Sequence, residues 1–525
     1  MTSPSVPSGK VWLVGAGPGE PDLISCRGRA LLESAEVVLY DALSHPELLA
    51  YCAGAELVDV GKRYGERSPA QDSISERLVF HARRGKRVVR LKGGDPMMFA
   101  RGGEEALALL DAGIEFEIVP GITSPVAAAE FAGIPLTHRE LSNSVTFITG
   151  SDREGVEWSP AAWQKLATAT GTICVLMGMR RLDAIAQAII VGGRSPATPA
   201  AVVMWGARPQ QRVVVGTLAD IAERARDAGL GSPAIVIVGE VVALREQLAW
   251  YDTKPLFGLR VLVARDSRQA LDTVESLRRR AAVPVVCPAI EIDTAPFADA
   301  LAARVDELAD YDWVVFTSQN GVSAAFAALE RRGRDARAFG RARIAVIGPR
   351  TAQALERHGL RADLVADEFV AENLAEKLLA SHAASPLASH TPQPGSPGRV
   401  LLVRAEQARE VLPERLRAAG LEVVVVPAYR TQPVQGEGLA RLVRALESET
   451  DVVLLSSSSM VDSIVAALGE RAAELLGRLR LCCIGPVTAA RAREHGLSVA
   501  LVASTYTIEA TLDELERLQR SPEAS

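Results

Sequence analysis

The stretch "IGPRTAQALERHGL", residues 347–360, returns almost unchanged as "IGPVTAARAREHGL", residues 484–497. Three further pairs share an offset of 139 residues: the strands ending at Arg265 and Arg404, the stretches "VVCPA" and "VVVPA" around Pro288 and Pro427, and the runs "FTSQNGV" and "LSSSSMV" from Phe316 and Leu455. The two Gly-Pro turns lie 137 residues apart. Landmarks at one nearly fixed offset predict that the second half of the chain is two copies of one α/β unit.

The composition is that of a globular protein with several domains. The 525 residues suggest three or four domains at about 100–200 residues each. Hydrophobic residues make up 48% and charged residues 23%, which is ordinary for such a protein. The net charge of −6 gives no basic field for nucleic acid or anionic lipid. No apolar run approaches the roughly 18 residues that cross a bilayer, so neither nucleic acid nor a membrane is an expected partner.

Short apolar runs alternate with amphipathic stretches along the chain, which predicts parallel sheets covered by helices. The composition breaks at residues 242–258, "VALREQLAWYDTKPLFG", which marks the main boundary. The Pro- and Ser-rich residues 381–398 predict a flexible surface loop, and the polar start "MTSPSVPSGK" predicts a short disordered lead. Six scattered cysteines lack metal-ligand spacing, so we expect no metal and a reducing, cytoplasmic compartment.

The first glycine-rich loop suggests a dinucleotide site but departs from its pattern. In "VWLVGAGPGEPDL", residues 11–23, Glu20 stands where the third glycine of G-x-G-x-x-G belongs. Pro18 and Pro21 also delay the following helix, whose N-terminus then cannot lie under a pyrophosphate. The loop therefore argues against NAD binding.

Several other turns in the first half carry glycines, hydroxyls or a carboxylate. The run "RLKGGDPMMFARGGEE", residues 90–105, ends a strand in Gly93-Gly94-Asp95, and "VPGITS", residues 119–124, ends another in Thr123 and Ser124. Glycines at a strand end let the main chain approach a ligand closely. "VVLYDAL" ends a strand at Asp41, and "VLMGM" begins a turn at Met177.

Together with "GAGPGEPDL", "VGKR", "GIPLTHRE" and "PAAVVMWGARPQQRVVVGTL", these motifs resemble the tetrapyrrole methylase family, and most closely its uroporphyrinogen-III C-methyltransferases. The resemblance covers residues 10–246 and implies two α/β lobes with S-adenosylmethionine between them and S-adenosylhomocysteine as product. It implies Asp41 as the base and Lys62 as its acid partner. It implies cofactor contacts at Pro18, Gly93, Gly94, Asp95, Met98, Thr123, Ser124, Met177 and Gly206. The chain departs from the family at Met97–Ala100, usually Phe-x-Phe-Gly, and at Pro125, often Ala.

The same residues admit plainer interpretations. Asp41 is also placed to cap a turn, Lys62 to be a solvated surface lysine, and Met177 to fill a core. The substrate of this family carries eight carboxylates, which need cations. Arg63, Arg101 and Arg139 are unranked candidates for binding them.

The duplicated half places hydroxyls at matching strand ends. Free N–H groups and hydroxyls at such edges suit carboxylates or phosphates, so two facing copies predict a cleft for one polyanion lined by Ser318, Asn320, Thr351 and Ser457. The alternative for Thr351 and Thr488 is helix capping.

From Gly258 onward, "VFTSQNGV", "IGPRTA", "LLVRAEQARE", "VPAYRT", "LLSSSSMV" and "CCIGPVTA" resemble uroporphyrinogen-III synthases. The resemblance implies no cofactor, a phenol donor at Tyr429 that assists the leaving hydroxyl, and family positions at Arg480 and Thr488. The alternative interpretation of Tyr429 is a half-buried aromatic residue at the hinge between the two lobes. It also implies that the chain crosses between lobes near residues 288–293 and 427–432.

The layout expected is a methyltransferase domain at 10–246, a linker at 247–257 and a synthase domain at 258–520, with lobes at 258–290 plus 432–520 and at 291–431. The chain is then a fused enzyme that acts on linear and cyclic tetrapyrroles, with a homodimer implied by the methylase family. Two alternatives stay open: methylation of a later corrinoid intermediate, and a C-terminal module that binds tetrapyrroles without catalysis.

Overall fold

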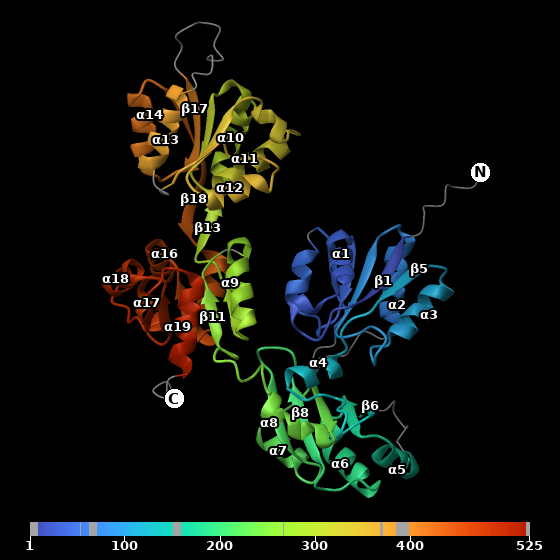
Figure 1. The fold of residues 1–525 in the computed structure, drawn as a ribbon. Coiled ribbons are helices and arrows are strands. Elements are labelled where there is room, and N and C mark those ends of the chain that lie inside the picture. The colour runs from blue at the N-terminus through green and yellow to red at the C-terminus, as the bar shows by residue number, and fades with distance from the viewer. Residues whose placement is uncertain are drawn as a thin grey trace, which may run out of the picture. The chain divides into compact units, whose positions relative to one another are not determined.

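The computed structural model describes residues 9–52, 54–61, 71–150, 159–265, 267–367, 371–384 and 398–520. These residues form four sheets with helices packed around them, an α/β architecture as the sequence predicts (Figure 1). No helix among them is long and apolar enough to cross a membrane. The predicted lead, Lys62, Arg63 and most of the predicted loop at 381–398 lie outside the described residues.

The first sheet is parallel throughout. Its order is β3 (Glu56–Asp59), β2 (Val37–Tyr40), β4 (Val88–Lys92), β1 (Lys10–Gly15) and β5 (Glu115–Val119). Helix α1 (Cys26–Ser34) packs on one face, and α2 (Gln71–Arg83) and α3 (Gly102–Asp111) pack on the other (Figure 1). Because the strands are parallel, their carboxyl ends share one edge, where ligands bind in such folds.

The second sheet is mixed, which corrects the expectation of parallel sheets throughout. Its order is β6 (Val145–Thr149), β7 (Thr172–Leu176), β10 (Ala234–Val238), β8 (Pro199–Met204) and β9 (Arg212–Thr217). Only β6 and β7 are parallel; the other pairs are antiparallel. The antiparallel pairing of β8 with β9 follows from their short connection, residues 205–211, since a parallel pair needs a crossover of a dozen or more residues.

Helices α4 (Ser124–Phe131), α5 (Pro160–Ala169), α6 (Leu182–Val191), α7 (Ile221–Asp227) and α8 (Arg245–Leu248) accompany the second sheet. Residues of α5, α6 and α7 share one apolar cluster with β7, β8 and β10, and residues of α4 share another with the same strands. Helix α4 begins directly after the β5 turn, so it carries that turn's residues toward the second sheet.

Two sheets make up the duplicated half. One has the order β12 (Val283–Val286), β11 (Arg260–Val263), β19 (Val452–Leu455), β20 (Arg480–Cys483) and β21 (Leu501–Val502). The other has the order β13 (Ile290–Asp293), β18 (Glu422–Pro433), β17 (Arg399–Ala405), β14 (Trp313–Phe316), β15 (Arg343–Val346) and β16 (Leu364–Val365). Each sheet combines strands of both sequence copies, and β13 pairs antiparallel with the end of β18. The chain passes from one sheet to the other between β12 and β13, as predicted near residues 288–293, and passes back between β18 and β19, beyond the predicted residues 427–432.

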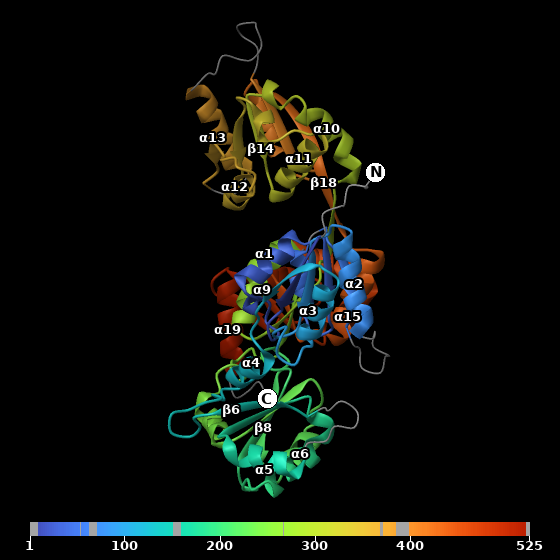
Figure 2. The ribbon, with the colours of Figure 1, turned by 90° about the vertical axis from the view of Figure 1, so that its right-hand side faces the viewer.

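Helices cover both faces of the β14 sheet (Figure 2). Helices α10 (Ala298–Val305), α11 (Gln319–Arg331) and α12 (Pro349–Glu356) share one apolar cluster with it, and α13 (Ala371–Ala384) and α14 (Val411–Ala418) share another. The remaining helices of this half are α9 (Ser267–Arg279), α15 (Gly436–Ser448), α16 (Ser458–Leu468), α17 (Ala472–Leu476), α18 (Pro486–Glu494) and α19 (Ile508–Arg520).

The copies agree in backbone detail. Ser318 and Ser457 are the N-caps of α11 and α16, with φ of −160° and −165° and ψ of 158° in both. Gly348 and Gly485 are the N-caps of α12 and α18, with φ of −176° and −179°. The duplication predicted from the sequence is therefore also present in the fold.

The chain divides into two compact units. The first comprises Met1–Val261, Glu275–Pro284 and Leu512–Ser525, and the second comprises Leu262–Val274 and Val285–Thr511. Within the first unit, the expected linker at 247–257 is packed rather than open. Tyr251 is 2% exposed, its hydroxyl donates to Glu20 Oε1 at 2.8 Å, and its ring lies 4.7 Å from that of Phe131. The predicted domain boundaries stay predictions.

Candidate functional site

Three glycine turns meet at the carboxyl edge of the first sheet. The main chains of Gly17 and Gly94 exchange hydrogen bonds, 3.2 Å from Gly17 N to Gly94 O and 2.7 Å from Gly94 N to Gly17 O. A Cβ added to Gly15 would lie 2.5 Å from Gly121 Cα, so no side chain fits there. Gly94 has φ of +69°, which favours glycine. The main chains of the three turns therefore pack directly against one another at this edge.

Asp95 ties these turns together. Its Oδ1 accepts hydrogen bonds from Met97 N at 2.8 Å and Met98 N at 3.1 Å, and its Oδ2 accepts one from Gly121 N at 3.0 Å. Ser124 lies over the same turn, since a Cβ added to Gly94 would be 2.9 Å from Ser124 Oγ. Most of the predicted cofactor residues of the first sheet are thus neighbours.

Thr123, Met98 and Pro18 flank these turns. Thr123 is the N-cap residue of α4, and its side chain makes no capping hydrogen bond. Met98 is 36% exposed, and Pro18 is partly buried next to Gly17. All three lie close in sequence to the glycines of this edge.

Asp41 lies beside the Gly93 turn. Its Oδ1 accepts hydrogen bonds from Leu43 N and Ser44 N, each at 3.2 Å, so it does cap the turn after β2. Its Oδ2 accepts one from Gly93 N at 3.3 Å. The carboxylate therefore has both the capping role and a place at the ligand edge. Its predicted partner Lys62 lies outside the described residues.

Met177 and Gly206 lie in turns of the second sheet. Met177 is 51% exposed with φ of +55°, so its interpretation as core filler is wrong. A Cβ added to Gly206 would lie 2.4 Å from Ala128 Cβ, and its neighbours Trp205 and Ala207 have φ of 52° and 61°. Such backbone strain concentrates at ligand sites.

Arg208 joins this turn of the second sheet to the Asp41 turn of the first. Its Nη2 donates to Leu43 O at 2.7 Å. Burial lowers the pKa of Arg208, and Glu20 partly opposes that shift. The sequence analysis missed this residue, although "WGAR" follows a strand end as the other ligand turns do.

The candidate cations for substrate differ in their surroundings. Arg101 is exposed, has φ of 59° and forms an ion pair with Glu104, whose Oε1 lies 2.8 Å from its Nε. Arg139 is exposed, and Arg63 lies outside the described residues. Two buried cations, Arg90 and Lys92, were missed, although an Arg and a Lys alternating along an apolar strand should signal a buried carboxylate partner.

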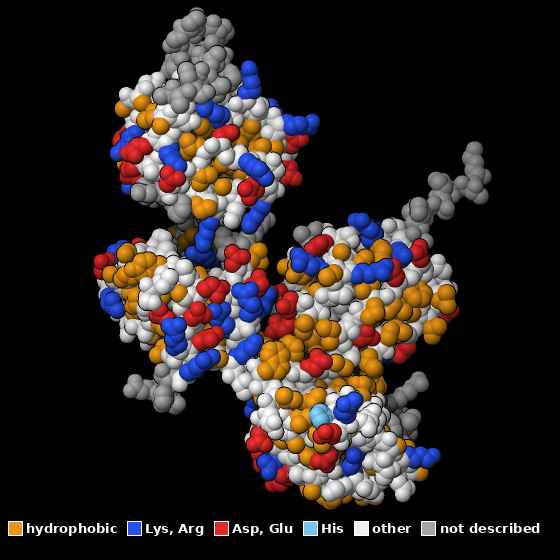
Figure 3. Space-filling model, viewed as in Figure 1, with side chains coloured by type: hydrophobic (Ala, Val, Ile, Leu, Met, Phe, Trp, Pro, Cys, Tyr) orange, Lys and Arg blue, Asp and Glu red, His pale blue; other side chains and the backbone are white. Residues whose placement is uncertain are grey.

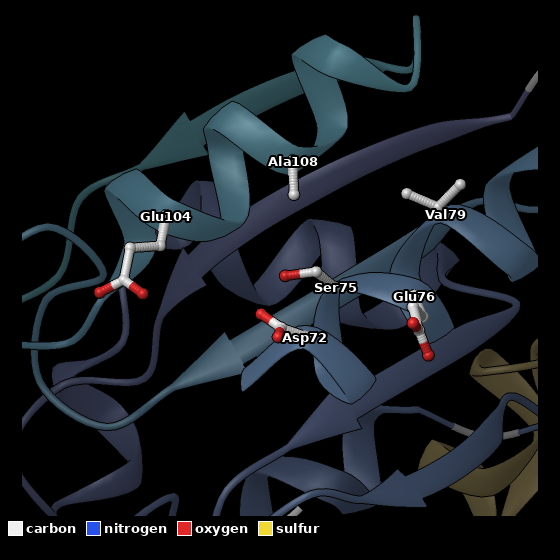
Figure 4. A pocket seen from close by; sticks show the side chains of 6 residues that line it. All are labelled: Asp72, Ser75, Glu76, Val79, Glu104 and Ala108. Carbon is white, nitrogen blue, oxygen red and sulfur yellow. The ribbon is translucent and has the colours of Figure 1, made fainter. Parts of the chain in front are cut away.

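A pocket of about 340 Å³ lies between α2 and α3 (Figure 4). Its lining residues are Asp72, Ser75, Glu76, Val79, Glu104 and Ala108. None of the predicted site residues lines it. Three carboxylates around this pocket repel an anionic ligand, so it does not suit the polycarboxylate that the resemblance implies.

In the second half, the fold brings Tyr429 and Ser318 together. Tyr429 lies in β18, is 7% exposed and donates from its hydroxyl to Ser318 Oγ at 2.9 Å. Ser318 Oγ also accepts from Gly321 N at 3.1 Å, which caps α11. Asn320 stands in the first turn of the same helix. The phenol is therefore buried and oriented.

The two threonines do not cap their helices. Thr351 and Thr488 lie inside the first turns of α12 and α18 and are each 4% exposed. The caps are Gly348 and Gly485, which have no side chain, so the capping interpretation is wrong. Each threonine keeps its predicted place at a carboxyl edge of a sheet.

Ser457 caps α16 at the carboxyl edge of the other sheet, and Arg480 lies elsewhere. Ser457 Oγ accepts from Met460 N at 3.2 Å. Arg265, used above only as a landmark, donates from Nη2 to the adjacent Ser456 Oγ at 2.8 Å and brings a cation to this edge. Arg480 begins β20 at its amino end, so the length of the strand, on the order of 10 Å, separates it from Thr488.

Comparison with known proteins assigns a family to each half. Residues 10–222 match the Tetrapyrrole (Corrin/Porphyrin) Methylases, and residues 272–513 match Uroporphyrinogen-III synthase HemD. The S-adenosyl-L-methionine-dependent uroporphyrinogen III methyltransferase of Methanosarcina barkeri is 49% identical over 46% of this chain and 94% of its own. A solved structure of uroporphyrin-III-C-methyltransferase from Thermus thermophilus is 42% identical, with a TM-score of 0.39, over 47% of this chain and 98% of its own.

One relative spans both halves. The porphyrin biosynthesis protein HemD of Ruminiclostridium josui is 35% identical over 508 residues, which are 97% of each chain. The order of the two family matches and this full-length similarity lead to one conclusion: the chain belongs to the HemD family of porphyrin biosynthesis proteins in which a tetrapyrrole methylase precedes a uroporphyrinogen-III synthase.

Proposed function

We propose that the chain catalyses two consecutive steps of tetrapyrrole synthesis. The C-terminal half closes hydroxymethylbilane to uroporphyrinogen III with inversion of the last ring. The N-terminal half then methylates uroporphyrinogen III to precorrin-2. The main support is structural: the Asp41 carboxylate lies beside the Gly93 turn, at the edge where the Gly15 and Gly121 turns also meet. A relative that spans both halves of the chain supports the pairing of the two activities.

The glycine edge fits S-adenosylmethionine as the methyl donor. When bound, this molecule supplies an electrophilic methyl group on a sulfonium sulfur. Glycine at Gly15 and Gly206 lets the main chain pack directly against Gly121 and Ala128, which holds the turns of the proposed site close together. The residues proposed to hold it are Pro18, Gly93, Gly94, Asp95, Met98, Thr123, Ser124, Met177 and Gly206.

The chain's own contribution to methyl transfer is orientation and one proton acceptor. Rigid turns hold donor and macrocycle in line, which removes much of the entropic barrier. The attacked pyrrole carbon must afterwards lose a proton, and the Asp41 carboxylate, 25% exposed at the edge, is placed to accept it. Lys62 is proposed as the acid partner from the resemblance alone.

In the synthase half, Tyr429 is the proposed donor to the leaving hydroxyl. Its bond to Ser318 fixes the direction of the phenol before substrate arrives. A phenolic hydroxyl can donate a hydrogen bond to the leaving oxygen. Ser318, Asn320, Thr351, Ser457, Arg480 and Thr488 are proposed substrate contacts, and this half uses no cofactor.

One experiment tests both activities. Purified full-length chain is incubated with hydroxymethylbilane, with and without S-adenosylmethionine, and the tetrapyrroles are identified by chromatography and mass spectrometry. We expect the type III isomer without the donor and precorrin-2 with it. A product ratio equal to spontaneous closure, which gives type I, would refute the synthase proposal. Unmethylated type III in the presence of the donor would refute the methyltransferase proposal.

We further propose a cytoplasmic homodimer formed through the methyltransferase half. Exposed apolar side chains on α2 and α3 support such a contact: Phe80, Leu107 and Leu110 are 53%, 61% and 63% exposed (Figure 3). All six cysteines are free thiols, which fits a reducing compartment. Sedimentation of the wild type and of Leu107→Glu separates a dimer from a monomer.

A further inference from the structure

Two cations share one buried carboxylate behind the Gly93 turn. Arg90 is 4% exposed, Lys92 3% and Glu105 0%. Both cations come from β4, and Glu105 lies in the first turn of α3. Glu105 Oε1 is 3.2 Å from Arg90 Nε and 2.8 Å from Lys92 Nζ. A single negative charge therefore faces two positive ones.

Asp41 supplies a second negative charge to this group. Arg90, Lys92 and Glu105 together carry a net charge of +1, and an uncompensated charge away from water is strongly unfavourable. Among the described residues, the other carboxylate paired with this group is Asp41, whose Oδ2 lies 3.8 Å from Arg90 Nη2. With Asp41 ionised, the four groups are neutral.

Hydrogen bonds to the main chain fix the guanidinium of Arg90 independently of its contact with Asp41. Its Nη1 donates to Leu91 O at 2.8 Å and Leu39 O at 3.4 Å, and the pairing of β2 with β4 sets Leu39 opposite Arg90. A planar fork held at several points keeps its direction. Burial, and then the neighbouring Arg90, lower the pKa of Lys92, as two close cations require.

We infer that Arg90 is a positioning residue for Asp41, whose carboxylate it holds aimed at the Gly93 turn. Glu105 and Lys92 act through Arg90 by holding its guanidinium in place. The inference rests on the proposed role of Asp41 as the base in methyl transfer. Replacing a residue with a purely structural role would change only the stability of the fold. Replacing a residue that positions Asp41 must also lower the rate of methyl transfer.

A double-mutant cycle tests this. Arg90→Gln should lower kcat for methylation of uroporphyrinogen III by roughly 10- to 100-fold, in the range that support of a general base contributes. The dissociation constant of S-adenosylmethionine should change by less than about twofold, and ring closure should not change. In an Asp41→Asn background, Arg90→Gln should cost less than about threefold more, because the two residues act as a unit.

The matched control is Arg87→Gln. Arg87 precedes the same strand, is exposed and lies 3.8 Å from Glu36, so its removal should leave kcat unchanged. Arg90→Lys, which keeps the charge and loses the fork, should give an intermediate rate and serves if Arg90→Gln does not fold. An equal loss from Arg90→Gln in both backgrounds overturns the inference.

Failure of the proposed function gives a different result. If the wild type transfers no methyl group to uroporphyrinogen III, that function is wrong. The same four variants can be compared by their melting temperatures, which needs no substrate. If the double variant's melting temperature falls by the sum of the two single-variant changes, Arg90 and Asp41 are not coupled and the inference is overturned.

Discussion

Tyr429 reaches Ser318 across 111 residues of sequence, and the bond between them is the sharpest chemical feature of the second half. Ser318 Oγ accepts from a main-chain N–H and from the phenol, so it holds Tyr429 as a donor whose direction is set. In the first half, Asp41 has a comparable position, because each of its oxygens accepts a main-chain hydrogen bond. At both sites a side chain is fixed before any ligand binds, which is the condition for efficient orientation.

Replacing Tyr429 with Phe removes the donor and keeps the buried ring. We expect formation of uroporphyrinogen III to slow by about 10- to 100-fold, the low end of the range for general acid catalysis, with more type I isomer. Chromatography of the two isomers measures both. Tyr311→Phe is the control, since Tyr311 is also buried and lies just before β14, at the amino end of that strand and the opposite edge of the same sheet. Equal effects of the two substitutions would contradict the role of Tyr429.

Replacing Asp41 with Asn removes the proton acceptor and keeps the shape of the side chain. We expect methyl transfer to fall by at least about 100-fold and ring closure to stay unchanged, as measured by label from S-adenosylmethionine and by isomer analysis. Asp59→Asn is the control, because Asp59 ends the neighbouring strand β3 and accepts from Gly61 N in a similar turn. A folded Asp41→Asn chain that loses both activities would count against two independent sites.

At the scale of elements, turns were easier to predict from the sequence than pairings. The Gly93–Asp95 and Thr123–Ser124 turns could be recognised because glycine and hydroxyl residues stand where apolar runs stop. The antiparallel pairs of the mixed second sheet were missed because strand residues do not encode the direction of their partners. The Arg90–Glu105–Lys92 group and the Arg208–Leu43 contact were missed because each depends on how elements distant in sequence meet. For Arg480, the sequence match did not indicate which end of a strand would carry the side chain, and the structure places it at the amino end of β20.

Gly206 joins a turn of the second sheet to α4, and Gly206→Ala should disturb that junction. The new Cβ would lie 2.4 Å from Ala128 Cβ and 2.8 Å from Ala128 Cα, so the turn must move. We expect the dissociation constant for S-adenosylmethionine, measured by calorimetry, to rise about tenfold or more, in line with a 1–3 kcal/mol overpacking cost. Gly231→Ala is the control, since nothing lies within 4 Å of its added Cβ. Unchanged affinity in Gly206→Ala would remove this turn from the cofactor site.

At the scale of the whole molecule, the cysteines report on packing in both units. Burial raises the pKa of Cys52 to about 11, of Cys174 to about 12, of Cys482 to about 12 and of Cys483 to about 11. It also raises the pKa of Cys287, whereas Cys26 is exposed. A raised pKa keeps a thiol protonated near neutral pH, and only the thiolate reacts quickly.

Alkylation of the native chain at pH 7.5 should therefore modify Cys26 within minutes and leave the other five cysteines unmodified, as peptide mass spectrometry would show. All six should react after denaturation. Raising the pH to 9 should still leave Cys174 and Cys482 unmodified, because burial keeps their thiols protonated. Fast labelling of Cys482 in the native chain would contradict the buried β20 strand.

The exchange of strands between the two sequence copies has a consequence for how such a chain arises. Each sheet contains the pattern 2-1-3-4-5, with its first two strands from one copy and its last three from the other. This is the strand order of a common self-sufficient doubly wound fold. A solitary copy can complete the pattern by folding back on itself, or by trading ends with a twin as a domain-swapped pair. The HemD half thus has the topology that two domain-swapped copies would have if they were joined into one polypeptide, and the β13–β18 ribbon corresponds to the exchanged arms.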